Sequence, residues 1–142
     1  SRLKLKLPSS YVKNLVRLTR GHPYNTQQAI RQVILSYVLD GNLPRPKELP
    51  DHLLRLEKDY LEKTWEAISR NKEYVHTLLA LSSGSANIYP RLQSKHINVA
   101  RSQKKLEEMG LLLKNERAGY RIADPLFELW IRKKIISIPG GC

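Results

Sequence analysis

The chain has 142 residues, of which 41% are hydrophobic and 27% charged. This length and composition suit one domain or two small ones, and they exclude a large multi-domain enzyme, a disordered chain and a collagen-like repeat. The net charge of +12, from 25 Lys and Arg against 13 Asp and Glu, favours an anionic partner and above all nucleic acid. The alternative is a basic surface that serves solubility or faces an acidic neighbouring domain.

Cysteine and histidine positions argue against a metal site. Cys142 is the only cysteine, so the chain has neither an intramolecular disulfide nor a cysteine-based metal cage. The four histidines, at positions 22, 52, 76 and 96, have no partner at metal-ligand spacing. No apolar run reaches membrane-spanning length, and the chain begins at Ser1 with a basic segment unlike a signal peptide, so we expect no membrane contact and a fragment of a larger cytoplasmic protein.

Two helices and a linker are expected in residues 1–48. Ser9 or Ser10 suits the N-cap of the first helix, which ends at Gly21. Its apolar positions are Val12, Leu15, Val16 and Leu18. The second helix follows the break at residues 21–26, ends at Asp40-Gly41 and has an apolar face made of Ala29, Ile30, Val33, Ile34, Tyr37 and Val38. Pro44, Pro46 and Pro50 then predict an extended linker, with a domain boundary near residue 48.

Residues 49–142 are expected to form a second unit. Asp51 caps a long helix whose buried stripe comprises Leu54, Leu61, Trp65 and Ile68. A shorter helix follows with Val75, Leu78 and Leu79 inward, and Ile88 with Leu92 indicates another short one. The next helix runs from Asn98 to Met109 with Val99, Leu106 and Met109 inward, and Gly110 ends it.

The pattern then changes to that of a hairpin. Residues 111–116 and 120–123 predict two short strands joined by Arg117-Ala118-Gly119. Asp124-Pro125 begins a last helix that carries Phe127 and Trp130. Three helices followed by a hairpin predict a mainly α fold, namely a winged helix-turn-helix with a small β-hairpin wing.

In such a module the third helix can enter the major groove of double-stranded DNA while the wing lies along a phosphate backbone. The helix presents Asn98, Arg101 and Lys105 at positions i, i+3 and i+7. Nearby candidates are Lys95, His96 and Lys104, and those on the wing are Lys114, Arg117 and Arg121. Glu107 and Glu108 reduce the positive field, so a solvated or protein-facing surface is the alternative.

Catalysis is disfavoured within this chain. No Gly-Lys-Ser/Thr phosphate loop is present. The apolar run that ends at Asp40 resembles a magnesium-binding strand of nucleotide hydrolases, but the helical cap before it and the glycine after it favour a helix. No local pattern assembles a nucleophile with its base. We therefore expect a chain that is not itself an enzyme and that has no cofactor of its own.

Two segments resemble a known family. Arg20-Gly21-His22-Pro23-Tyr24, followed by a helix, resembles the glycine-x-proline motif in the lid of archaeal ATPases of the STAND class, relatives of AAA+ proteins. Residues 106–112 and the run Gly119-Tyr120-Arg121-Ile122-Ala123-Asp124-Pro125 with its following helix are similar to the end of that family's winged helix. The resemblance covers roughly residues 8 to 134, and Gln103 departs from it, since an apolar residue is often found there.

The resemblance implies that the chain is the C-terminal part of such an ATPase, with a helical lid at 1–48 and a winged helix at 49–142. Gly21, His22 and Pro23 would then sense nucleotide, and ATP or ADP with magnesium would bind the full-length parent. The expected function is DNA binding, regulation of the nucleotide-dependent switch, or both. The alternatives are a protein-interaction module that docks on the parent's own ATPase core or an acidic partner, a free-standing winged-helix transcription regulator and, most distantly, a hydrolase.

Overall fold

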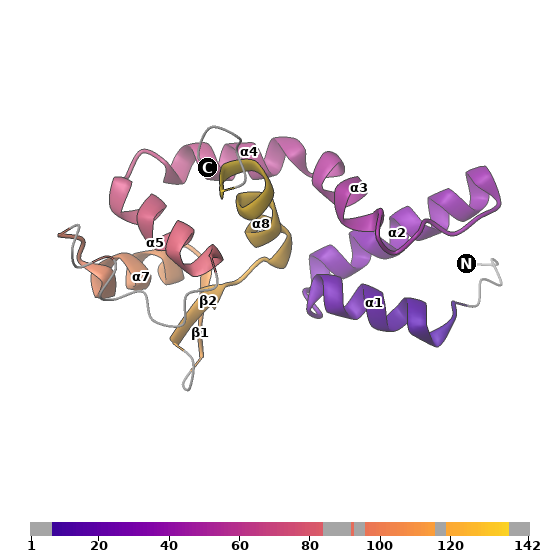
Figure 1. Ribbon diagram of the computed structural model, residues 1–142, viewed down its shortest axis with the longest axis horizontal. Coiled ribbons are helices and arrows are strands. Elements are labelled where there is room, and N and C mark those ends of the chain that lie inside the picture. The colour runs from indigo at the N-terminus through magenta and orange to yellow at the C-terminus, as the bar shows by residue number, and fades with distance from the viewer. Residues whose placement is uncertain (1–6, 84–91, 93–95, 116–118, 137–142) are drawn as a thin grey trace. The chain divides into compact units, whose positions relative to one another are not determined.

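The computed structural model describes residues 7–83, 92, 96–115 and 119–136 (Figure 1). Within these ranges the chain is mainly helical and carries a small two-stranded antiparallel sheet, as expected. It divides into two compact units, Ser1–Glu57 and Lys58–Cys142. The division lies nine residues beyond the expected boundary at 48, because the proline-rich segment and the helix after it pack with the first unit.

The first unit contains helices α1 (Ser9–Thr19), α2 (Pro23–Asp40) and α3 (Leu49–Leu56). The expected serine cap of α1 is wrong: Pro8 occupies the N-cap position, and no side chain caps this end. The turn after α1 is left-handed at Arg20, with φ 48°, and at Gly21, with φ 73°. Glycine adopts this conformation without steric cost, which is why the helix ends here.

The core of the first unit is built from one stripe of each helix. The buried positions are Tyr11, Leu15 and Thr19 of α1, Asn25, Ala29 and Val33 of α2, and Leu49, Leu53 and Leu54 of α3. Two of the apolar positions of α1, Val12 and Val16, are 42% and 53% exposed. The helix contacts its neighbours through the i, i+4, i+8 stripe that begins at Tyr11, so these two valines face away.

The proline-rich segment is not a free linker. The Tyr11 hydroxyl donates a hydrogen bond of 2.8 Å to the carbonyl oxygen of Pro44, and Leu49 is buried. Pro50 lies in the first turn of α3, where a missing N–H costs no helical hydrogen bond. Glu57 accepts a 3.0 Å hydrogen bond from the Tyr24 hydroxyl. This residue separates α3 from the next helix, α4 (Lys58–Ile68). The single long helix expected from Asp51 is therefore two helices.

The second unit contains α4 (Lys58–Ile68), α5 (Lys72–Ser82), α7 (Val99–Glu108), β1 (Leu112–Asn115), β2 (Gly119–Ile122) and α8 (Pro125–Trp130), followed by the π-helical turn η1 (Ile131–Ile136). Side chains of Asn71, Asn98 and Asp124 cap α5, α7 and α8. The short helix expected around Ile88 lies outside the described residues, except that Leu92 is helical and buried.

The expected hairpin is confirmed. Strands β1 and β2 pair antiparallel, with Leu112 opposite Ile122 and Lys114 opposite Tyr120. Leu112 and Ile122 are each only 1% exposed, so this end of the hairpin belongs to the core. The hairpin contacts α5, α7 and α8, and it thereby closes one side of the second unit.

An aromatic cluster packs α4 against α8. The ring centroids of Trp65 and Trp130 lie 5.9 Å apart, and Phe127 lies 6.5 Å from Trp65 and 6.1 Å from Trp130. Leu61 and Ile68, on the same helix as Trp65, are almost fully buried, as expected. This cluster therefore holds the last helix onto the fold.

Candidate nucleic-acid interface

The position of helix α7 is set by one cap and one buried face. The Asn98 side chain accepts a 3.0 Å hydrogen bond from the Arg101 backbone N–H, which satisfies a donor in the first turn. The buried residues of α7 are Val99, Ser102, Gln103 and Leu106. They share one side of the helix, so the opposite side faces solvent.

Three cations occupy that exposed side. Arg101, Lys104 and Lys105 are spaced i, i+3 and i+4, which places them on one stripe. The Arg101 guanidinium lies 3.2 Å from Glu73 of α5 and remains 65% exposed. Lys105 lies 3.7 Å from Glu108 and is 57% exposed. The stripe can therefore reach an external anion, although carboxylates already contact two of its three members.

One expectation about the inward face of α7 is corrected. Met109 is wrong as a core residue, because it is 52% exposed. Met109 is the C-cap of α7, and it lies outside the buried positions of this helix. Gln103, the departure from the resembled pattern, is only 4% exposed and lies on the core side.

The hairpin cations do not share a face. Lys114 lies opposite Tyr120, whereas Arg121 lies opposite Leu113, and successive side chains of a strand point to opposite sides. The Lys114 ammonium sits 5.9 Å from the centre of the Tyr120 ring, and the Tyr120 hydroxyl contacts Glu107 of α7 at 3.2 Å. Lys114 therefore lies on the α7 side of the hairpin and Arg121 on the other side.

The remaining expected DNA contacts are placed only in part. His96 is exposed and has a positive φ of 59°. Lys95 and Arg117 lie outside the described residues. The geometry therefore brings Arg101, Lys104 and Lys105 together on one stripe, and the Tyr120–Glu107 contact places Lys114 on the α7 side of the hairpin.

The Gly21-His22-Pro23 segment forms the turn between α1 and α2. His22 is the N-cap of α2, and its Nδ1 accepts a 3.3 Å hydrogen bond from the Asn25 N–H. Pro23 is the first residue of α2 and is exposed. Thr26 and Thr19 join the two helices through a 3.0 Å hydrogen bond between their hydroxyls. The histidine thus has a structural role in this turn as a helix cap.

Sequence reasoning missed the contacts that orient the basic stripe. Glu73 Oε2 accepts from the Arg101 guanidinium at 3.2 Å and from the Ser102 hydroxyl at 3.4 Å. Glu73 lies 28 positions before Arg101, so no local spacing signals the pair. Since it lies in the first turn of α5, the carboxylate is also favoured there by the helix dipole.

Other kinds of site receive no support from the described ranges. They contain no group of three His, Cys, Asp or Glu residues that could hold a metal ion. No helix in these ranges is long and apolar enough to cross a membrane.

No protein-family model matches the chain, and neither a curated protein nor a solved structure is significantly similar to it.

Proposed function

We propose that the second unit is a winged helix-turn-helix module that binds double-stranded DNA through the exposed side of α7. The observation that carries this proposal is the stripe of Arg101, Lys104 and Lys105, which lies directly opposite the buried side of the helix. An α-helix fits the major groove, and cations on its outer face can contact phosphates or base edges. The hairpin that follows α7 in the chain supports the assignment of a wing.

Glu73 shapes how the stripe would be used. The Arg101 guanidinium already contacts Glu73 before DNA binds. The Arg101 side chain therefore loses less conformational entropy on binding. Arginine offers paired donors that match the acceptor edge of guanine. Lys104 and Lys105 would contribute contacts to phosphates, which add affinity and salt dependence without reading sequence.

A second candidate is docking on an acidic protein. Met109 and Leu113, which are 52% and 46% exposed, follow α7 closely in the chain. Exposed apolar residues beside cations suit a protein surface that carries carboxylates and an apolar contact. The acidic surface would belong to an ATPase core of the parent protein or to another partner.

We also propose that the parent is an ATPase of the STAND class and that the first unit is its lid. Support comes from the Gly21-His22-Pro23 turn, where Pro23 is exposed at the start of α2, and from the motif that ends in Asp124-Pro125. In a protein that carries the ATPase core, Pro23→Ala is expected to change the affinity for ATP or ADP with magnesium. The same substitution in the present chain should leave DNA affinity unchanged.

The DNA proposal is tested by fluorescence anisotropy with a short labelled duplex at several salt concentrations. The double variant Arg101→Ala/Lys105→Ala is expected to weaken binding by roughly tenfold or more and to reduce the salt slope by about 1, because one phosphate contact is lost together with the base contact of Arg101. The matched control is Lys58→Ala/Lys63→Ala, which removes two exposed cations that belong to α4 rather than to α7.

Equal loss in both variants would show that only the net charge matters, and it would contradict the assignment to α7. The absence of duplex binding at low salt, with binding of an acidic protein that is sensitive to Met109→Ser and Leu113→Ser, would favour the second candidate.

A further inference from the structure

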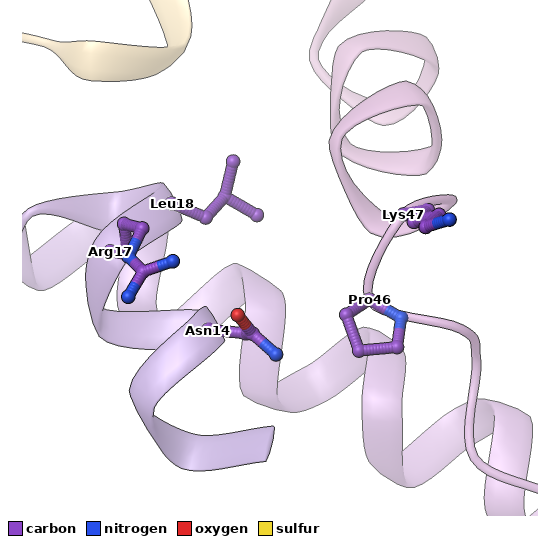
Figure 2. Close-up of a pocket in the computed structure, with 5 residues that line it drawn as sticks. All are labelled: Asn14, Arg17, Leu18, Pro46 and Lys47. Carbon is purple, nitrogen blue, oxygen red and sulfur yellow. The ribbon is translucent and has the colours of Figure 1, made fainter. Parts of the chain in front are cut away.

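A hollow of about 440 Å³ lies in the first unit, between α1 and the segment that leads into α3 (Figure 2). It is lined by Asn14, Arg17 and Leu18 from α1 and by Pro46 and Lys47 from the other wall. The three α1 residues are spaced i, i+3 and i+4, so they share one face of the helix. In Figure 2 the Asn14 carboxamide points across the opening toward Pro46.

The two walls are held together from below. The Tyr11 hydroxyl binds the Pro44 carbonyl oxygen at 2.8 Å, two residues before Pro46. Leu15 and Leu49 are 6% and 2% exposed, and only about 10 Å³ remains open among the residues beneath the hollow. Such a space holds at most one water molecule. The hollow therefore has a packed floor and exists before any ligand arrives.

The charge of the hollow is positive on both walls. Arg17 and Lys47 are exposed, and neither forms an ion pair with another described residue. No carboxylate lines the hollow. Glu48, which follows Lys47 in the sequence, lines a different depression together with Asp40 and His52. Two cations on opposite sides of a preformed opening suit a phosphate group.

The hollow also offers apolar contact. Leu18 and Pro46 come from opposite walls and can cover the two sides of a sugar or base ring. The Asn14 carboxamide provides both donors and an acceptor, as does the edge of a base. The volume is within the range of about 300–1,000 Å³ found for small-ligand pockets. A carboxylate-bearing peptide would use the cations, but it would not need an apolar surface on each wall.

We infer that this hollow is a binding site for a nucleotide unit, with Arg17 and Lys47 on the phosphate, Leu18 and Pro46 against the ring and Asn14 at the ring edge. The unit can be a free nucleotide or one residue of a single strand. The inference is independent of the α7 stripe, because all five residues belong to the first unit.

The test is a ¹H–¹⁵N NMR titration of the full chain with AMP, with a short oligothymidylate and with inorganic phosphate, read at the side-chain amide of Asn14 and the backbone amides of residues 14–18 and 47. We expect saturable shifts there with AMP or the oligonucleotide. Arg17→Gln/Lys47→Gln should weaken the apparent affinity roughly tenfold, because each side chain provides a charge-assisted contact. Backbone resonances elsewhere in the spectrum report whether the variant remains folded.

Matched controls separate this site from general charge effects and from the proposed DNA surface. Lys13→Gln/Arg31→Gln removes two exposed cations of the same unit outside the hollow, and Arg101→Gln/Lys105→Gln removes two from α7. Both control variants should keep the shifts of Asn14. Tighter binding of AMP than of the oligonucleotide would identify a free nucleotide as the ligand, and binding of the oligonucleotide alone would identify a strand.

Three results would overturn the inference. One is no saturable shift at residues 14–18 with either nucleotide probe. Another is an equal loss of affinity in the Lys13/Arg31 control. The third is inorganic phosphate binding as tightly as AMP, which would show that Leu18, Pro46 and Asn14 do not contact a ring.

Discussion

At the scale of single residues, Tyr11 ties the proline-rich segment to α1. Its side chain is buried, its hydroxyl donates to the Pro44 carbonyl oxygen, and burial raises its pKa above the usual value of 10.0. The phenol must stay protonated to donate this bond. The Tyr11 hydroxyl therefore ties the wall that carries Pro46 and Lys47 to α1.

We expect Tyr11→Phe to lower the free energy of unfolding by about 1 kcal/mol at neutral pH, since one partly buried hydrogen bond is lost. The raised pKa means that the folded state holds the phenol proton more tightly than the unfolded chain does. The contribution of Tyr11 is thus complete below about pH 10 and is lost as the pH rises through the folded-state pKa. Urea unfolding at pH 7 and at strongly alkaline pH measures both effects.

The Phe variant keeps all the other tyrosines, so the comparison of the two proteins isolates the effect of the Tyr11 hydroxyl. The gap in stability between the native chain and the variant should narrow as the pH rises above 10. A gap that stays constant or widens would contradict the placement of the Tyr11 hydroxyl.

At the scale of elements, α5 and α7 are linked by a shared carboxylate. Glu73 receives contacts from both Arg101 and Ser102, and Ser102 is buried. The same carboxylate orients Arg101 and lowers the positive potential of the α7 stripe. These two effects act in opposite directions on the binding of an anion.

We expect Glu73→Gln to increase duplex affinity by roughly two- to fivefold at low salt, because a negative charge beside Arg101 is removed while a hydrogen-bond acceptor is kept. The free energy of unfolding should fall by less than about 1 kcal/mol, as for an exposed ion pair. Anisotropy titrations at two salt concentrations measure the first effect, and urea unfolding measures the second. A decrease in affinity would show that the orientation of Arg101 outweighs the charge.

The hairpin shows a second effect at this scale. Since Lys114 and Arg121 lie on opposite sides of the two strands, one phosphate backbone cannot contact both. Lys114→Gln is expected to lower the salt slope of duplex binding by about 1, because Lys114 lies on the α7 side. Arg121→Gln should leave the slope unchanged. The reverse result would place the duplex on the other side of the hairpin.

At the scale of the whole molecule, the chain has two compact units, and both tryptophans belong to the second. Trp65 and Trp130 lie in the aromatic cluster between α4 and α8. Tryptophan fluorescence therefore reports only the second unit, whereas far-ultraviolet circular dichroism reports the helices of both. The two signals can reveal whether the units unfold together.

We expect non-coincident urea transitions by the two methods, because each unit has its own core. Coincident transitions in the native chain would show that the units unfold as one.

Trp130→Ala should destabilise the second unit by roughly 3 to 5 kcal/mol, as truncation of a buried aromatic does. It should leave the transition of the first unit in place, and Trp65 remains as the fluorescent probe. A loss well below this range would mean that α8 does not depend on the cluster.

Much of the second unit was predictable from local signals. The Asp124-Pro125 start of α8, the turn at Gly110 and the two strands follow from capping, proline geometry and glycine. Leu61, Ile68 and Leu106 follow from helical spacing of apolar residues. Met109 was misplaced, and the exposure of Val12 and Val16 was not foreseen, because spacing shows that a helix has an apolar face but not which of two overlapping stripes meets a neighbour.

The sequence by itself determined the mainly helical composition of this protein, the hairpin and the excess of positive charge, because each depends on residue types within a few positions of one another. Only the tertiary structure decided the division after Glu57, the Glu73–Arg101 contact, the opposite sides of Lys114 and Arg121, and the hollow between Arg17 and Lys47. These features join residues that are distant in sequence or depend on strand register. Packing, rather than local propensity, brings such residues together.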